Sequence, residues 1–142
     1  MKIFFDTNVI LDILDTHRPS TENSSIVLSE SRARRFEIVI TTQSIIDSYY
    51  VAHRTGLVRE DVDRTIAWFS NHVIVRSISV FDIQSAIRSG QPDFEDAAQV
   101  LCADAEGCDV FLTNDRRLLE RNFGTSMLML TPQQFVDKMR RQ

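Results

Sequence analysis

Several residue types that mark particular classes of protein are scarce in this chain. Its 142 residues include two cysteines, three prolines and four glycines. Cys102 and Cys108 are too few for a disulfide framework, so we expect reduced thiols in a cytoplasmic protein. The scattered glycines form neither a glycine-rich phosphate loop nor a dinucleotide-binding fingerprint. No apolar run is long enough to span a membrane, and no signal-peptide pattern follows Met1.

Zinc and serine chemistry also find little support in the sequence. His17, His53 and His72 are isolated, and none has zinc-site spacing to a cysteine or to another histidine. Ser44 and Ser48 have no matched histidine base, which argues against a serine nucleophile. These absences turn attention to the acidic residues.

The chain is mildly acidic, with a formal net charge of -4 and a sequence pI of about 5.3. Proteins that bind nucleic acid usually present a basic face, so the charge alone argues against such a partner. Carboxylates that hold metal change this argument, because two divalent cations would neutralise four acids and reverse the local sign of the charge. The composition is therefore compatible with a metal-dependent phosphodiesterase.

Apolar runs that alternate with helical patterns indicate the fold class. Each of three runs stops at polar residues that open a helix, which is typical of buried strands feeding helices. The pattern predicts one domain over residues 1–142, an α/β sandwich with a mainly parallel central sheet. Strands are expected at 3–5, 37–41, 73–75, 110–112 and 127–130, and helices at about 9–14, 21–35, 42–54, 59–71, 79–89, 92–106, 116–121 and from 132 onward.

Capping residues sharpen several of these helix boundaries. Ser20 or Thr21 is expected to cap the second helix. Ser79 and Asp82 have the spacing of a capping box. Thr131 is expected to cap the last helix, with proline at its first position.

Acidic residues occupy the places where the predicted strands end and helices begin. Asp6 follows the first strand, Asp47 lies early in the helix after the second, and Asp115 follows a later strand. Asp93 and Asp96 open another helix. Ligands of a parallel sheet bind outside the carboxyl ends of its strands, so these acids are expected to meet there. Clustered carboxylates repel one another unless a cation offsets the repulsion, and Mg²⁺ and Mn²⁺ prefer oxygen ligands.

Divalent cations at such a site supply a defined chemistry. One cation lowers the pKa of a water molecule and polarises a phosphate, and two cations about 3.5–4 Å apart clamp the attacking and leaving oxygens. Asp104 lies roughly 12 Å along the helix axis from Asp96, so it cannot share a cation with Asp96 and is expected at the surface.

Each of these acids also has an ordinary structural explanation. Asp6 and Asp93 can be helix caps, and the capping-box spacing to Asp96 favours a cap at Asp93. Asp47 can lie on a solvated helix face, and Asp115 can be a turn residue.

Basic and aromatic residues near the acids leave similar alternatives. Arg116 and Arg117 either contact RNA phosphates or form a solvated face, and the second is favoured. Tyr49 and Tyr50 either stack on bases or, as their helical spacing favours, pack in the core or an interface.

Three motifs, in this order along nearly the whole chain, resemble the PIN (PilT N-terminus) domain family. They are Asp6-Thr7-Asn8, Asp93-Phe94-Glu95-Asp96-Ala97 and Thr113-Asn114-Asp115. The resemblance implies an α/β/α sandwich and a cytoplasmic Mg²⁺- or Mn²⁺-dependent endoribonuclease, similar to VapC toxins that pair with an antitoxin and are often dimers. It also implies Asp6, Asp96 and Asp115 as metal ligands, with Thr7, Asn8 and Thr113 as supporting polar groups.

The chain departs from the family pattern at one acid. The family commonly has glutamate on the helix after the second strand, where this chain has Asp47, which is one methylene shorter. We expect Asp47 to assist catalysis, Asp93 to serve as a further metal ligand, and Asn114 to be either a ligand or a turn residue. Because of this departure, a second interpretation is that the chain is a catalytically weak module that binds RNA or a protein partner. A hydrolase of small phosphoesters is a third interpretation.

Overall fold

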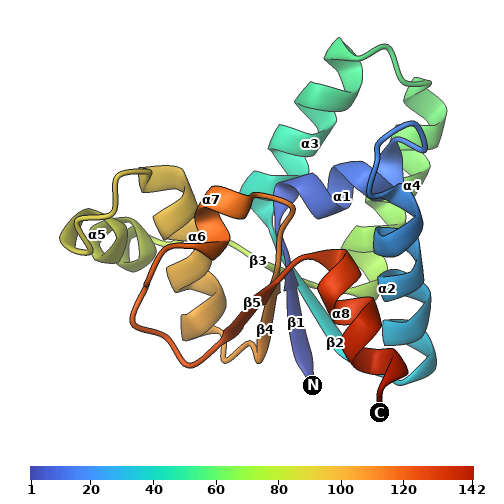
Figure 1. Ribbon diagram of the computed structural model, residues 1–142. Coiled ribbons are helices and arrows are strands. Elements are labelled where there is room, and N and C mark those ends of the chain that lie inside the picture. Colours follow the sequence, from blue (N-terminus) through green and yellow to red (C-terminus); the bar gives the residue numbers. More distant parts are fainter.

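The computed structural model describes residues 1–142 and contains one sheet of five parallel strands. The strands are β1 (Lys2–Phe5), β2 (Glu37–Thr41), β3 (Ile74–Arg76), β4 (Val110–Leu112) and β5 (Leu128–Leu130). Their order across the sheet is β3-β2-β1-β4-β5. The predicted parallel sheet is therefore confirmed, with β1 at its centre (Figure 1).

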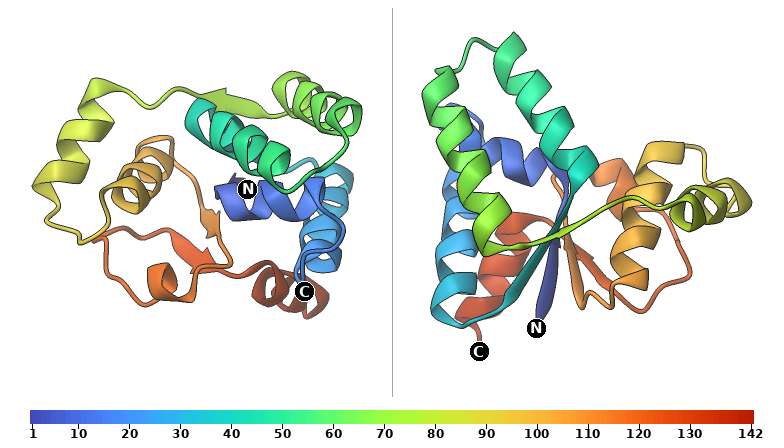
Figure 2. Two further views of the ribbon diagram at one scale, coloured as in Figure 1. Left: turned by 90° about the horizontal axis from the view of Figure 1, so that it is seen from above. Right: turned by 180° about the vertical axis from the view of Figure 1, so that it is seen from behind.

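Helices cover both faces of the sheet and complete the three layers (Figures 1 and 2). One face carries α1 (Thr7–Leu14), α2 (Thr21–Ala33), α3 (Thr42–Arg54), α4 (Arg59–His72) and α8 (Pro132–Arg140). The other carries α5 (Val80–Arg88), α6 (Phe94–Ala105) and α7 (Arg116–Leu119). None of the helices is both long enough and apolar enough to cross a membrane.

Alternating side chains on the strands build a separate core on each face of the sheet. In β1, Ile3 and Phe5 join the cluster under α1, α2 and α8, whereas Phe4 joins the cluster under α6 and α7. This follows from the two-residue period of a strand. Phe4 stacks on Phe111 of the neighbouring strand, with ring centroids 4.9 Å apart and planes 10° from parallel. The central strands are buried on both sides, as parallel strands usually are.

Most predicted helix boundaries agree with the structure to within two residues. The capping boxes at Ser79 and Thr131 are both present. The expected cap of α2 is wrong: Ser20 occupies the N-cap position, but its side chain makes no cap hydrogen bond. The hydroxyl of Thr21 instead donates to the carbonyl oxygen of Asp12 at 2.5 Å, because α2 packs against α1 at this point.

The order of the strands places the carboxyl end of β1 at a switch point. From β1 the chain adds β2 and β3 in one direction, and then β4 and β5 in the other. A crevice outside the strand ends opens where the direction reverses, which here is between β1 and β4. The backbone N–H of Asp6 donates to the carbonyl of Leu112 at 3.0 Å across this junction.

Candidate active site

Asp6 is held at the junction of β1 and α1 by a set of hydrogen-bond donors. Only 9% of its surface is exposed. Its Oδ1 accepts from the backbone N–H of Thr7 at 2.8 Å, and its Oδ2 accepts from Thr113 Oγ1 at 2.7 Å and Asn8 Nδ2 at 3.0 Å. Thr7 thus supports Asp6 through its backbone, while its hydroxyl donates to Ser44. Asp6 is also the N-cap of α1, so its capping and site positions coincide.

Asp93 and Asp96 lie together at the start of α6. Asp93 is the N-cap, and its Oδ1 accepts from the backbone N–H of Asp96 at 3.0 Å. The cap interpretation of Asp93 is therefore confirmed, and its ligand role stays a prediction. Asp96 Oδ2 lies 3.2 Å from Arg121 Nη1, and both side chains are about one-quarter exposed. Asp96 is therefore paired within the chain and still reachable from solvent.

Asp115 caps α7 from the turn that follows β4. Its Oδ1 accepts from the backbone N–H groups of Arg117 at 2.9 Å and Leu118 at 3.3 Å. Its own N–H donates to Thr113 Oγ1 at 3.1 Å, and the same hydroxyl donates to Asp6. Thr113 thus links the two acids across the β1–β4 switch point.

The charges of these acids influence one another. Burial raises the pKa of Asp6 from 3.8 to about 6, and the charges of Asp96 and Asp115 add to the increase, while the hydrogen bond from Thr113 opposes it. Burial also raises the pKa of Asp96, with further increases from Asp93 and Asp115 and a decrease from Arg121. Acids from three separate segments of the chain therefore lie close enough for their charges to interact.

Asp47 joins this acidic edge through Glu95. Asp47 accepts a hydrogen bond from Gln43 Nε2 at 2.9 Å on its own helix. Burial raises the pKa of Glu95, and the charge of Asp47 and a hydrogen bond with Asp47 raise it further. The charges of Asp93 and Asp96 act in the same direction. The helices α3 and α6 thus bring a second acidic pair beside the first group.

The side chains of Asp6, Asp96 and Asp115 have the donor chemistry that a hard divalent cation prefers. They offer carboxylate oxygens, which Mg²⁺ and Mn²⁺ prefer, and they carry like charges that a cation would offset. No three of the histidine, cysteine, aspartate or glutamate side chains already surround one point as ligands. Asp96 is turned toward Arg121 and Asp115 toward the start of α7.

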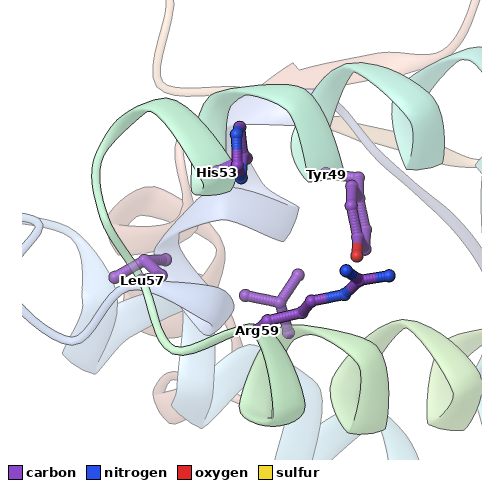
Figure 3. Close-up of a pocket in the computed structure, with 5 residues that line it drawn as sticks. Tyr49, His53, Leu57 and Arg59 are labelled. Carbon is purple, nitrogen blue, oxygen red and sulfur yellow. The ribbon is translucent and has the colours of Figure 1, made fainter.

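A cleft between α3 and α4 is separate from the acidic site. Tyr49, His53, Leu57, Arg59 and Val62 line it (Figure 3). None of these residues is an acid, so the cleft lacks the carboxylate oxygens that the acidic site offers. Tyr49 packs here as its spacing predicts.

A model of the PIN domain family matches residues 2–117, a range that holds all of the convergent acids. The chain belongs to the PIN domain family. The predicted three-layer fold is the fold of its structural neighbours, so the family resemblance of the motifs is confirmed.

This PIN domain is similar along nearly its full length to a curated ribonuclease. Ribonuclease VapC1 from Aquifex aeolicus (strain VF5) is 26% identical over 145 residues, which cover 96% of this chain and 94% of the relative. A solved structure of VapBC2 from Rickettsia felis, bound to a promoter DNA fragment, matches with a TM-score of 0.70 at 13% identity over 92% of this chain and 98% of that chain. VapC20 from Mycobacterium tuberculosis, a sarcin-ricin loop cleaving toxin, matches with a TM-score of 0.68 at 14% identity over 82% and 92%. Both structures support the fold alone.

Two residues of the PIN domain site have no role in the motif-based prediction. Glu95 lies inside the Asp-Phe-Glu-Asp motif. Its position next to Asp96 at the start of a helix is the sequence feature that could have indicated a role in the site. Arg121 reaches Asp96 from 25 positions along the chain, after a short helix. No local pattern marks such a contact, so only the folded chain reveals it.

The raised pKa of Asp6 predicts how the stability of the metal-free protein depends on pH. The folded protein keeps the Asp6 proton up to about pH 6, whereas the ordinary pKa is 3.8. Between these values the folded state binds a proton that the unfolded chain has lost, so this group makes stability fall as pH rises, and its penalty is complete above about pH 6. Urea unfolding of the wild type and Asp6→Asn between pH 4 and 7.5 should show a steeper fall in the wild type, because Asp96 and Glu95 also have raised pKa values and remain in the variant. Parallel pH profiles would contradict the assignment.

Proposed function

We propose that this PIN domain is a Mg²⁺- or Mn²⁺-dependent endoribonuclease that serves as the toxin of a toxin–antitoxin pair. The observation that carries the proposal is that the charges of Asp96 and Asp115 act on Asp6, which lies at the switch point between β1 and β4. The similarity to a ribonuclease over 96% of the chain supports RNA as the substrate class.

The three acids would hold the cation, and the surrounding residues fix where they point. Hydrogen bonds from Asn8 and Thr113 orient Asp6, and capping interactions orient Asp115. A bound cation supplies electrostatic stabilisation of the phosphate and lowers the pKa of a nearby water. Arg121 pairs with Asp96 in the protein without metal.

The RNA would approach over the start of α7. Arg116 and Arg117 are exposed there, directly after Asp115, and neither side chain forms an ion pair or hydrogen bond. Cationic side chains free of partners are suited to the phosphates on either side of the scissile bond. Asn114 is a further polar residue that supports the acids, and its side chain donates a hydrogen bond to Asp12.

Removal of metal tests the proposed activity most simply. The purified protein should cut a circular RNA in Mg²⁺ or Mn²⁺, because only an endonuclease opens a circle, and should lose the activity in EDTA. A chromogenic phosphomonoester should not be hydrolysed under the same conditions. Cleavage that persists in EDTA would contradict the metal requirement, and hydrolysis of the phosphomonoester without RNA cleavage would favour a small-molecule phosphohydrolase.

Two exposed apolar surfaces support protein partners. On α3, Ile46 and Tyr50 are 63% and 59% exposed, beside the cleft of Figure 3, and we assign this surface to a cognate antitoxin. On α5, Val80, Phe81 and Ile87 are each more than 60% exposed, and we assign this surface to a second copy of the chain in a homodimer. Large apolar side chains clustered at a surface are typical of protein interfaces.

A catalytically weak module that binds RNA or a protein is the second candidate. The pairing of Asp47 with Glu95 favours it, since a carboxylate engaged with another acid is less available to a cation. RNA affinity that persists without any divalent binding or cleavage would support this candidate over the nuclease.

A further inference from the structure

Asp12 is a buried acid that the proposed nuclease site does not include. It lies on α1, and only 1% of its side chain is exposed. Its Oδ1 accepts from Arg18 Nε at 2.9 Å, and its Oδ2 accepts from Ser24 Oγ at 2.7 Å and Asn114 Nδ2 at 2.6 Å. Burying a carboxylate costs several kcal/mol unless partners of this kind satisfy it. Three other segments are thereby joined to α1 at this one side chain.

The partners of Asp12 have different positions in the fold. Arg18 comes from the connection between α1 and α2, and Ser24 comes from α2, so these two bonds tie helices together. Asn114 comes from the turn between β4 and α7, directly between Thr113 and Asp115. Of the three bonds, only the one from Asn114 connects Asp12 to the segment that carries Asp115.

Two side chains of α1 accept hydrogen bonds from the turn that carries Asp115. Asp12 accepts from the Asn114 side chain, and Asn8 Oδ1 accepts from the Asn114 backbone N–H at 2.9 Å. Asn8 Nδ2 in turn donates to Asp6 Oδ2 and to Thr113 Oγ1, both at 3.0 Å. One helix therefore fixes Asp6 at its start and the β4–α7 turn along its first two turns.

We propose that Asp12 is a positioning residue that holds Asn114, and through it fixes the β4–α7 turn on which Asp115 lies. Arg18 balances the charge of Asp12, which offsets the cost of burying this carboxylate. The strong acceptor of a charged side chain gives Asn114 a shorter and firmer bond than a neutral group would. The consequence for metal binding rests on the proposed function, whereas the effect on the turn does not.

Four variants separate positioning from helix packing. Asp12→Ala and Asn114→Ala both remove the bond to the turn, and Ser24→Ala removes a neighbouring bond to the same oxygen and serves as the matched control. Calorimetric titration with Mn²⁺ should show affinity about 10–100-fold weaker in the first two, as for other residues that orient ligands, and within about twofold of wild type in Ser24→Ala. The double variant Asp12→Ala/Asn114→Ala should bind Mn²⁺ as Asn114→Ala does, although it should melt at a lower temperature. Equal losses of affinity in Asp12→Ala and Ser24→Ala, or additive losses in the double variant, would overturn the proposal.

Amide hydrogen exchange provides a readout that needs no metal. In the metal-free protein, the amides of residues 113–116 should exchange faster in Asp12→Ala and Asn114→Ala than in the wild type or Ser24→Ala. If Asp12→Ala does not fold, Asn114→Ala and the more conservative Asp12→Asn replace it. A wild type that binds no Mn²⁺ would refute the proposed function, and the exchange rates would still decide the positioning role: unchanged exchange in both variants would refute it.

Discussion

Replacing Asp6 with asparagine should abolish RNA cleavage and make the metal-free protein more stable at neutral pH. Substitution of residues that merely orient metal ligands costs about 10–100-fold, so loss of a ligand carboxylate should cost more than about 100-fold in the rate of cleavage. Stability moves the opposite way because the pKa of the buried Asp6 is raised to about 6, so its charge at pH 7.5 disfavours the folded state. We expect a gain of about 1–2 kcal/mol, less than the whole electrostatic penalty because an amide satisfies Thr113 and Asn8 less well.

The two readouts come from the same purified variant. Cleavage of an RNA in Mn²⁺ gives the first, and urea unfolding in EDTA at pH 7.5 gives the second. Asp104→Asn is the matched control, because Asp104 is exposed near the end of α6 and should change neither quantity appreciably. A variant that loses both activity and stability would contradict this prediction, because it would mean that Asp6 acts mainly as the structural cap of α1.

Phe111→Ala should have the largest effect on stability of the single substitutions considered for this chain. Phe111 is fully buried in β4 and stacks on Phe4 at 4.9 Å under α6 and α7. Truncation of a buried phenylalanine costs about 3–5 kcal/mol because it removes apolar contacts and leaves a cavity. The free energy of unfolding of a native domain is about 5–15 kcal/mol in total, so the variant should be close to unfolding at 37 °C.

Chemical denaturation of the metal-free protein measures this loss. Phe94→Ala is the control, because Phe94 is 50% exposed at the start of α6 and should cost less than about 0.5 kcal/mol. Phe111→Leu should fall between the two. A loss below about 1 kcal/mol in Phe111→Ala would contradict the packing of α6 and α7 on this face of the sheet.

The fold and the principal acids were predictable because both depend on local patterns. Strands such as β2 stand out as short apolar runs, and the positions of Asp6 and Asp115 follow from strand ends. The same local reasoning found the capping boxes at Ser79 and Thr131. It failed for Ser20, where packing of α2 on α1 engages the neighbouring Thr21 instead.

The supporting network was beyond prediction because its bonds cross the fold. Asn114 meets Asp12 across 102 positions and Asn8 across 106 positions, and Arg121 reaches Asp96 across 25. No spacing rule relates residues so far apart. An acid within the otherwise apolar run of α1 was the only hint that Asp12 is buried.

The arrangement of the acids also bears on how the site responds to a cation. Arg121 pairs with Asp96, and hydrogen-bond donors contact Asp6, so the repulsion between the acids is only partly offset in the metal-free protein. Under the proposed function, the ion pair between Arg121 and Asp96 would compete with a cation for Asp96.

Calorimetric titration of Mn²⁺ into the metal-free protein at pH 7.5 tests the central claim most directly. We predict saturable binding to the wild type and to Asp104→Asn, and no measurable binding to Asp6→Asn, Asp96→Asn or Asp115→Asn, each shown to be folded by circular dichroism. Binding that is equally strong in all of these proteins would contradict the claim that the three acids form one cation site.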